Sequence, residues 1–414
     1  MIQDKNNRIF FSFHLLLLAE ILFLAVSLGS AGSYVLPYPT TSAVVKYIIV
    51  LFTILGLLIY TRRIHINRIS ILAFCFFIRI IIEVPNLSHG EAIDSEIKYL
   101  FTLIASLFVV MIYSQNWQDD KKIGVTNSLI ITLLIIALQT ILTFALTFQS
   151  LAAYWGLKDR LHLPIGSSNF VECWILMLTS FLFYRDDKRD AWKIGLFLIG
   201  FISALCTRSK VAILVWGIWF IVILLKSYFK PKLKNFLLIV VVILAVYYVY
   251  ESLDSINFFE YSTNVLLNLF SFDPTSRQAA FNGRIELYRS AYEAFTYSTK
   301  TILIGNGRSY SAVSGIAHNY FLDILATSGI VGLILVIIQY CSVLSTLSKN
   351  RKLNSYSKAA LVMIGFIFIN SMYEPCIDDY CFNILYWMII SLGLQQANSE
   401  QGRRVTNGIS TTLI

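Results

Sequence analysis

The feature that most constrains this chain is a succession of long apolar runs separated by short polar segments. A run of about 17–25 apolar residues is the length that an α-helix needs to cross a membrane. The sequence therefore predicts an all-α, polytopic membrane protein with about 12 transmembrane helices. The predicted spans lie at about 10–30, 43–61, 69–85, 97–114, 128–149, 168–184, 191–207, 210–226, 235–250, 328–347, 358–373 and 380–396.

The composition excludes the main alternatives to a membrane protein. Of the 414 residues, 57% are hydrophobic and only 14% are charged, whereas about a quarter of the residues in a soluble domain are charged. A soluble enzyme, a disordered chain and a secreted disulfide-bonded scaffold are therefore excluded. None of the six cysteines forms a CxxC pair of the metal-binding type. Cys376 and Cys381 lie in one short loop. They are expected either to form a disulfide bond, if the loop faces an oxidising compartment, or to remain free thiols.

The distribution of basic residues predicts the orientation of the chain. The net charge is +9, from 33 Lys and Arg against 24 Asp and Glu. In a membrane protein Lys and Arg collect in the cytoplasmic segments, so this charge does not indicate a nucleic-acid partner. With the N-terminus inside, 21 of the 33 basic residues fall in inside segments and the other 12 fall outside or within spans. Both termini are therefore predicted to be cytoplasmic.

One large outer loop divides the chain into three parts. Residues 1–250 are predicted to hold transmembrane helices 1–9, 251–327 to form the loop, and 328–414 to hold helices 10–12 and a cytoplasmic tail. The stretch 284–298 within the loop has a helical pattern. A loop of this size can cover a polar site at the membrane surface, as a membrane enzyme requires. The absence of two similar halves disfavours a transporter built from repeats.

Several basic residues on the outer side are candidates for binding an anionic ligand. Arg208 stands between two apolar spans, and an Arg at a membrane boundary is costly unless it is paired or functional. Its planar guanidinium suits a lipid-linked phosphate, although an interfacial Arg can also extend its head group to water. The outer loop adds Arg284 and Arg308, each of which has the alternative of a solvated surface charge. Taken together, these residues predict an anionic ligand such as a pyrophosphate-linked lipid.

His318 is the candidate general base. Histidine is the side chain whose ordinary pKa allows base catalysis near neutral pH, and the alternative is a capping or packing residue at the start of a helix. The Gly305–Gly307 segment is interpreted as a turn, because a phosphate-binding loop needs a preceding strand and a following helix. Glu374, Asp378 and Asp379 form an acidic cluster in the last outer loop. These carboxylates are expected to pair with the loop arginines, to position a sugar, or to be solvated.

Four patches of the sequence together resemble the O-antigen ligase and O-antigen polymerase family of bacterial inner-membrane glycosyltransferases. Each patch is short, and their order and placement make the match specific. The topology of about twelve spans with one large loop before the last few also agrees with the family. The patches are Arg160 to Asn169, Thr207-Arg208-Ser209 followed by an apolar span, Arg284 to Tyr288, and Gly305-Asn306-Gly307 followed by Ala317-His318-Asn319-Tyr320 and Ser328-Gly329-Ile330. The chain departs from the family pattern at Lys210, where Gly or Ala is more usual, and at Tyr288, where the family has Trp.

The resemblance implies a mechanism at the periplasmic face of the inner membrane. The donor is a glycan on undecaprenyl pyrophosphate, and an acceptor hydroxyl attacks its anomeric carbon. By resemblance, His318 is the candidate base, Arg208 and Arg284 are the candidate pyrophosphate-binding residues, and Arg160 and Arg308 are further substrate-binding candidates. No metal or other cofactor is expected, because Arg side chains can neutralise the leaving group. The expected partners are the lipid-linked donor and acceptor, membrane lipids and, as a further candidate, a chain-length regulator.

Three functions fit the sequence to different degrees. A polymerase, which joins lipid-linked repeat units, is preferred because of the aromatic content and the departures at Lys210 and Tyr288. A ligase, which transfers the finished glycan to lipid A-core, is the first alternative. A flippase or transporter of the lipid-linked oligosaccharide is the second alternative. A transporter should line its midplane with charge, whereas here the arginines gather at one surface, with Arg79 as the main exception.

Overall fold

The structure is a computed structural model of the whole chain. It describes residues 50–56, 70–88, 93–115, 119–147, 166–185, 190–207, 215–223, 284–308 and 315–395, together with 12, 14, 17–18, 59, 117, 162–163, 209 and 310–311.

The described residues are almost entirely helical, as the apolar runs predict. The one pair of strands among the described residues is antiparallel and joins β1 (His162–Leu163) with β2 (Gly166–Ser167), directly before a helix. The helices in chain order are α3 (Ser70–Glu83), η2 (Val84–Ser88), α4 (Ile93–Tyr113), α5 (Asp119–Thr147), α7 (Ser168–Phe183), α8 (Asp190–Cys206), α13 (Arg284–Thr296), α14 (Thr299–Ile304), α16 (Tyr320–Asn350), α17 (Ser355–Ser371), η3 (Cys376–Asp378) and α18 (Tyr380–Leu394).

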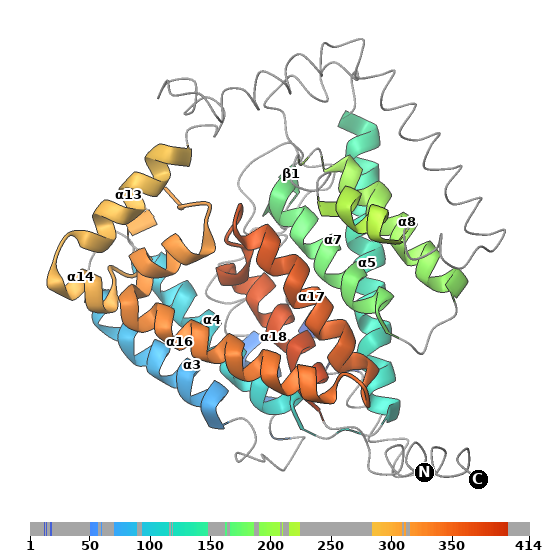
Figure 1. Cartoon of the computed structure of the whole chain (residues 1–414), viewed down its shortest axis with the longest axis horizontal. Helices are drawn as coiled ribbons and strands as arrows, with labels where there is room; N and C mark the ends of the chain where they lie inside the picture. The colour runs from blue at the N-terminus through green and yellow to red at the C-terminus, as the bar shows by residue number, and fades with distance from the viewer. Residues whose placement is uncertain are drawn as a thin grey trace, which may run out of the picture.

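Two groups of helices pack on either side of a central pair (Figure 1). Helices α3, α4 and α16 form one group, and α5, α7 and α8 form the other. The central helices α17 and α18 pack against each other, with α18 against α4 and α17 against α7. The short helices α13 and α14 pack on one end of α16. Segments that are far apart in the sequence therefore meet around α17 and α18.

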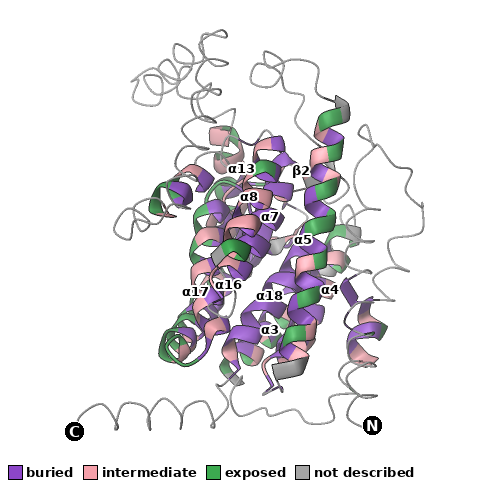
Figure 2. Ribbon diagram, turned by 90° about the vertical axis from the view of Figure 1, so that its right-hand side faces the viewer, coloured by how far each residue is buried: buried purple, intermediate pink, exposed green. Residues whose placement is uncertain are grey.

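Burial follows the composition of each helix (Figure 2). Residues 171–182 of α7 and 381–393 of α18 are all buried, as expected for helices that are apolar on every side. Small residues allow close helix contacts. A Cβ atom on Gly393 would lie 2.8 Å from the Ala360 Cβ, so α17 and α18 approach closely at this glycine.

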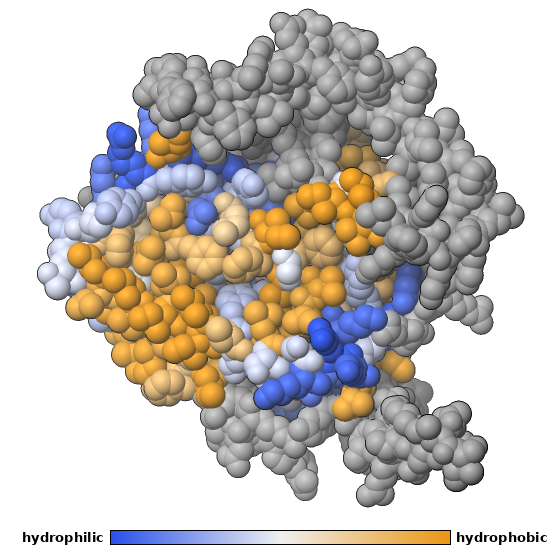
Figure 3. Space-filling model, in the orientation of Figure 1, coloured by the Kyte–Doolittle hydropathy of each residue, from blue (hydrophilic) through white to orange (hydrophobic). Residues whose placement is uncertain are grey.

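An apolar flank is exposed on one side of the molecule (Figure 3). Large apolar side chains of α3, including Phe74 and Phe77, and of α16, including Ile334 and Ile337, are about half exposed. An exposed apolar surface of this kind needs lipid or another apolar partner. Three described helices are long and apolar enough to cross a membrane, at Ser95–Tyr113, Lys121–Ala145 and Tyr320–Asn350. Shorter apolar helices lie at Ser168–Phe183, Ala191–Cys206, Ser355–Ser371 and Cys381–Leu394.

The described helices coincide with eight of the predicted spans, although several boundaries differ. Helix α5 begins at Asp119, nine residues before the predicted span at 128–149, because the polar residues that precede the apolar run continue the helix. The count of twelve stays a prediction. The predicted spans at 10–30, 43–61, 210–226 and 235–250 lie partly or wholly outside the described residues.

The segment that is predicted to form the outer loop contains α13 and α14, and its Gly305–Gly307 part packs into a break in α16. Helix α13 confirms the helical stretch that was predicted at 284–298. The predicted boundary between loop and span, at 327/328, falls inside α16, close to a break at Gly329, where φ is 67°. Such a break removes hydrogen bonds from the helix and frees carbonyl oxygens. The N–H groups of Asn306 and Gly307 donate to the carbonyls of Ala326 and Thr327, at 2.9 and 2.8 Å.

These bonds disfavour a phosphate-binding loop at Gly305–Gly307, in agreement with its interpretation as a turn. Two of its N–H groups are used inside the protein, so they are not directed at a phosphate. The Asn306 side chain also donates to the carbonyl of Ala294 in α13, at 2.6 Å. The turn therefore holds α13 and α14 on the end of α16, where His318 lies.

Candidate functional site

His318 lies immediately before α16, in a strained backbone conformation. The helix is capped by Asn319, whose side-chain oxygen accepts from the N–H groups of Phe321 and Leu322 at 3.1 and 3.2 Å. His318 is therefore not the capping residue. Its φ is 49°, and it is the one non-glycine with positive φ among the described residues. Such conformations cost about 1–3 kcal/mol and gather at functional sites.

The imidazole of His318 pairs with a buried carboxylate. Its Nδ1 lies 3.1 and 3.2 Å from the two carboxylate oxygens of Glu374. The Glu374 side chain is 3% exposed and the His318 side chain is 33% exposed. A carboxylate only accepts, so this contact places a proton on Nδ1 and leaves a lone pair on Nε2. The arrangement leaves a partly exposed imidazole that a buried carboxylate holds in one orientation. The interpretation of Glu374 as a solvated charge is wrong, because its side chain is 3% exposed.

Two further residues hold Glu374 in place. The side-chain amide of Asn169, near the start of α7, donates to Glu374 at 2.9 Å. The hydroxyl of Ser209 donates to the oxygen of the same amide at 2.8 Å. Asn169 and Ser209 are both buried. This chain of hydrogen bonds joins three of the four sequence patches that carry the family resemblance, and it brings the residue next to Arg208 to the same end of the molecule as His318.

Helix α13 carries two of the residues that the sequence analysis singled out, Arg284 and Tyr288. The two residues are four apart, on one helical face, and Arg284 is hydrogen-bonded to the Tyr288 hydroxyl. Burial raises the pKa of Tyr288, Arg284 opposes the rise, and the charge of Glu374 adds to it. Tyr288 therefore lies within the range of an electrostatic interaction with the Glu374 carboxylate. Arg289 is exposed on another face.

Arg308 is held by a buried ion pair. Its Nη1 lies 2.6 Å from a carboxylate oxygen of Asp323, whose side chain is fully buried. The Tyr310 hydroxyl donates to the other oxygen of Asp323. The guanidinium also lies over the Tyr99 ring, 4.7 Å from its centroid. These contacts fix the direction of Arg308 and neutralise part of its charge.

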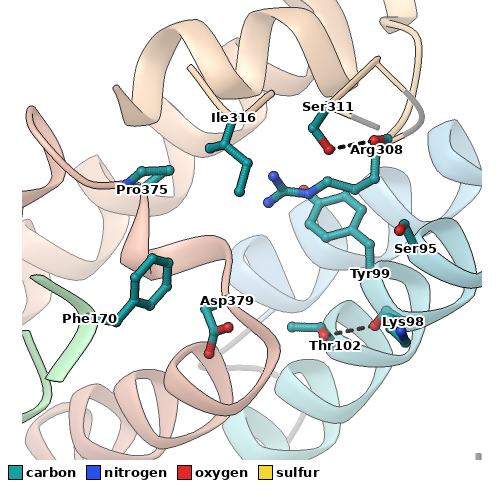
Figure 4. Close-up of a pocket in the computed structure, with 10 residues that line it drawn as sticks. All are labelled: Ser95, Lys98, Tyr99, Thr102, Phe170, Arg308, Ser311, Ile316, Pro375 and Asp379. Carbon is teal, nitrogen blue, oxygen red and sulfur yellow. Dashed lines mark hydrogen bonds between the residues drawn. The ribbon is translucent and has the colours of Figure 1, made fainter. Parts of the chain in front are cut away.

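A cleft of about 190 Å³ is lined in part by close chain neighbours of His318 and Glu374, which do not themselves line it (Figure 4). One face of α4 forms one side, and the loops before α16 and α18 form the others. The Arg308 guanidinium points inward from the loop before α16, across from Phe170 and Pro375. The lining residues are Ser95, Lys98, Tyr99, Thr102, Phe170, Arg308, Ser311, Ile316, Pro375 and Asp379.

Asp379 combines a structural contact with a place in the cleft. Its side chain caps α18 by accepting from the N–H of Phe382 at 3.1 Å. Burial raises the pKa of Asp379 to about 6, against the opposing effects of backbone hydrogen bonds and of Arg308. Part of the residue surface reaches the cleft. Its carboxyl group therefore takes up a proton in mildly acidic solution.

The structure brings together three of the five predicted site residues. His318, Arg284 and Arg308 surround the end of α16, whereas Arg160 and Arg208 lie outside the described residues. Sequence reasoning missed the pairing of Glu374 with His318 and the place of Lys98 in the cleft. The signal available for Glu374 was a carboxylate in a short loop between two predicted spans. All six cysteines are free thiols, and the Cys376 thiol contacts that of Cys173 rather than Cys381.

Comparison with known proteins identifies one family. A family model described as O-antigen ligase matches residues 195–337, about a third of the chain. Residues 195–337 are therefore similar to an O-antigen ligase family domain. This match confirms the resemblance found in the sequence, and its range includes Arg208, Arg284, Arg308 and His318. Asn169 and Glu374 lie outside the matched range. No curated protein matches the chain.

The family match supports a glycosyltransferase-like enzyme of the O-antigen ligase or polymerase type. It does not separate the two activities. The apolar helices and the domain together indicate a membrane protein.

Proposed function

We propose that this protein is an O-antigen polymerase, which joins oligosaccharide repeat units carried on undecaprenyl pyrophosphate at the periplasmic face of the inner membrane. The observation that carries the proposal is the partly exposed imidazole of His318, oriented by the buried Glu374. A base of this kind can activate a sugar hydroxyl as a nucleophile.

In the proposed reaction His318 Nε2 takes the proton of the acceptor hydroxyl. The hydroxyl oxygen forms a bond to the anomeric carbon of the donor, and the bond from that carbon to the pyrophosphate oxygen breaks. Glu374 keeps the proton on Nδ1 and stabilises the imidazolium that forms, because its carboxylate accepts from the ring. An in-line attack of this kind inverts the anomeric configuration.

Arginines would neutralise the departing pyrophosphate. Arg284 is hydrogen-bonded to Tyr288, whose pKa the charge of Glu374 affects. Arg208 directly precedes Ser209, which is buried. A guanidinium that meets the charge developing on the leaving group lowers the barrier without a metal. Arg160 is a further candidate for the same role. Arg308 is less suited to a pyrophosphate, because its charge is already balanced by Asp323.

The surroundings of Arg79 disfavour a transporter. Arg79 is 1% exposed, and its guanidinium donates to the Tyr99 hydroxyl at 2.6 Å and to Gln339 at 3.5 Å. A charge that lines a transport pathway faces a water-filled cavity, whereas Arg79 is enclosed between helices. The burial of Arg79 and its two hydrogen bonds therefore favour an enzyme, whose charged groups gather around a site at one surface, over a transporter.

A ligase is the second candidate, and it is favoured by the description of the matched family. The departures at Lys210 and Tyr288 favour the polymerase. Purified protein should be given the lipid-linked repeat unit as its only substrate. Elongation without lipid A-core supports the polymerase. Transfer that occurs only when lipid A-core is added would refute the polymerase and support the ligase.

A further inference from the structure

We propose that Glu172 of α7 is a positioning residue, which acts on the base His318 through Glu374. Its carboxylate fixes α7 against the end of α17, and this alignment keeps Asn169 in contact with Glu374. The inference rests on the proposed function, because it concerns the base of that reaction. It adds to the proposed function two positioning residues, Glu172 and Asn370.

Glu172 is a buried carboxylate with neutral partners. It is the one charged residue among residues 168–183 and is 0% exposed. Its Oε1 accepts from the indole N–H of Trp216 at 3.1 Å, and its Oε2 accepts from the side-chain amide of Asn370. No cation pairs with it among the residues that the structure describes. A buried carboxylate of this kind is costly, and inside a membrane helix it is by default a candidate for function.

Two pairs of an amide and a carboxylate join α7 to the end of α17, in opposite directions. Asn169 of α7 donates to Glu374 at 2.9 Å, and Asn370 of α17 donates to Glu172. Asn169 and Glu172 are three residues apart on one helical face. Glu374 lies four residues after Asn370, and its N–H donates to the Asn370 carbonyl at 3.0 Å. A shift of α7 against α17 would therefore break both pairs together, so the bond at Glu172 fixes the geometry at Glu374.

Trp216 holds Glu172 from a third segment of the chain. Trp216 is 0% exposed, and its ring packs against that of Trp219 with centroids 5.0 Å apart. Ser209, seven residues earlier, donates to Asn169 at 2.8 Å. The same face of α7 is therefore bound at two points by the chain that follows α8. Since the buried indole is held by packing, its bond keeps the Glu172 carboxylate in one place.

The first test is the kinetic effect of removing one acceptor oxygen. Glu172→Gln puts an NH2 group in place of a carboxylate oxygen, so one of the two donors loses its acceptor. With purified full-length protein and the lipid-linked repeat unit as substrate, kcat should fall about tenfold or more, because a small displacement near a reacting group has effects of this size. The KM should stay within about twofold. Thr179→Val is the matched control, at a buried α7 residue whose hydroxyl has no hydrogen-bond partner among the described residues.

A second test asks whether Glu172 acts through Glu374. In a Glu374→Gln background, Glu172→Gln should cause no further loss of kcat, because both changes act on the base through the same contact. A residue that only supports folding would instead lower the yield or the unfolding temperature and leave the kcat of the folded fraction intact.

Exchanging the two partners provides a rescue that does not require the single variant to fold. In Glu172→Gln combined with Asn370→Asp, the new amide can donate to the new carboxylate, and its carbonyl oxygen can still accept from Trp216. The kcat of this double variant should return to within about threefold of wild type. A folded double variant that transfers at less than a tenth of the wild-type rate would overturn the inference.

The remaining outcomes separate this inference from the proposed function. A kcat of Glu172→Gln within twofold of wild type, or a further loss of kcat in the Glu374→Gln background, would refute the role of Glu172 and leave the proposed function standing. A wild-type protein that transfers to neither the lipid-linked repeat unit nor lipid A-core would instead refute the proposed function.

Discussion

At the scale of single residues, the conformation of His318 connects local strain with chemistry. A residue with φ of 49° is uncommon unless it is glycine, asparagine or aspartate, although histidine is also enriched there. Asn319 could cap α16 whatever residue preceded it. The histidine therefore stands in a costly conformation that the helix cap does not require, and the contact with Glu374 supplies a reason for its presence.

Replacing the base should separate activity from folding. We expect His318→Asn to abolish glycan transfer, since asparagine cannot take the proton. The thermal unfolding midpoint should stay the same or rise slightly, because asparagine tolerates this φ. Transfer assays and thermal unfolding in detergent measure the two effects. Transfer at the wild-type rate would remove His318 from the mechanism.

Glu374 should act as a positioning residue. Glu374→Gln keeps the size of the side chain and removes the charge that stabilises the imidazolium. We expect kcat to fall by about two orders of magnitude or more, while the KM values for donor and acceptor change little. A purely structural role would instead lower the amount of folded protein and leave the kcat of the folded fraction intact.

Asp379 should make stability depend on pH. Its folded-state pKa of about 6 lies above the ordinary value of 3.8, so the folded protein holds more protons than the unfolded chain between these values. The contribution of this group to stability therefore falls as pH rises from about 4 through 6. Asp379→Asn keeps the helix cap and should unfold at a higher temperature than wild type at pH 8. This gain should vanish near pH 4, and a gain that is equal at both pH values would contradict the assignment.

At the scale of elements, the break in α16 is a built feature. Gly329 has a positive φ, and a Cβ at this position would lie 2.5 Å from the carbonyl carbon of Leu303. Gly305, which follows α14, packs against α16 just before Gly329. A Cβ on Gly305 would lie 2.0 Å from the Thr327 carbonyl oxygen. The two glycines let the turn at Gly305–Gly307 dock on the broken helix, and this docking positions the loop that carries His318.

Adding a methyl group at the break should be costly. We expect Gly329→Ala to lower the free energy of unfolding by about 2 kcal/mol or more, from backbone strain and overpacking. Gly365→Ala is the matched control, because that glycine lies exposed in α17 and an added Cβ meets nothing within 4 Å. It should be neutral or stabilising by about 0.5–1 kcal/mol. Denaturation in detergent compares the two, and equal stabilities would contradict the packing described here.

At the scale of the whole molecule, α16 connects the end that carries the candidate site with the end that carries a basic segment. The helix is broken at Gly329, and at 1.5 Å per residue the segment from Ile330 to Asn350 extends about 31 Å, enough to cross a bilayer core of about 30 Å. The candidate site lies at its first residues, and the basic segment of Lys349, Arg351 and Lys352 lies at its last. This polarity agrees with the outer site and inner basic residues that the sequence predicts.

Thiol labelling tests this orientation. In a background with Cys341→Ser, which removes the exposed one of the six cysteines, Tyr297→Cys should react with a membrane-impermeant reagent added outside. Leu353→Cys should react only after the membrane is permeabilised. Both positions are well exposed, at 85% and 52%, so access is set by the membrane alone. Reaction of both from the same side would contradict the predicted topology.

The sequence determined the helical class, most helix positions and the candidate base, because apolar length and residue chemistry are local properties. It also predicted the helix that became α13 and the turn at Gly305–Gly307. Only the tertiary structure decided which groups meet. Glu374 lies 56 residues from His318 and 205 from Asn169, and Lys98 reaches the cleft through the packing of α4 against α18. Contacts over such separations depend on how helices pack, and no local pattern in one sequence encodes them.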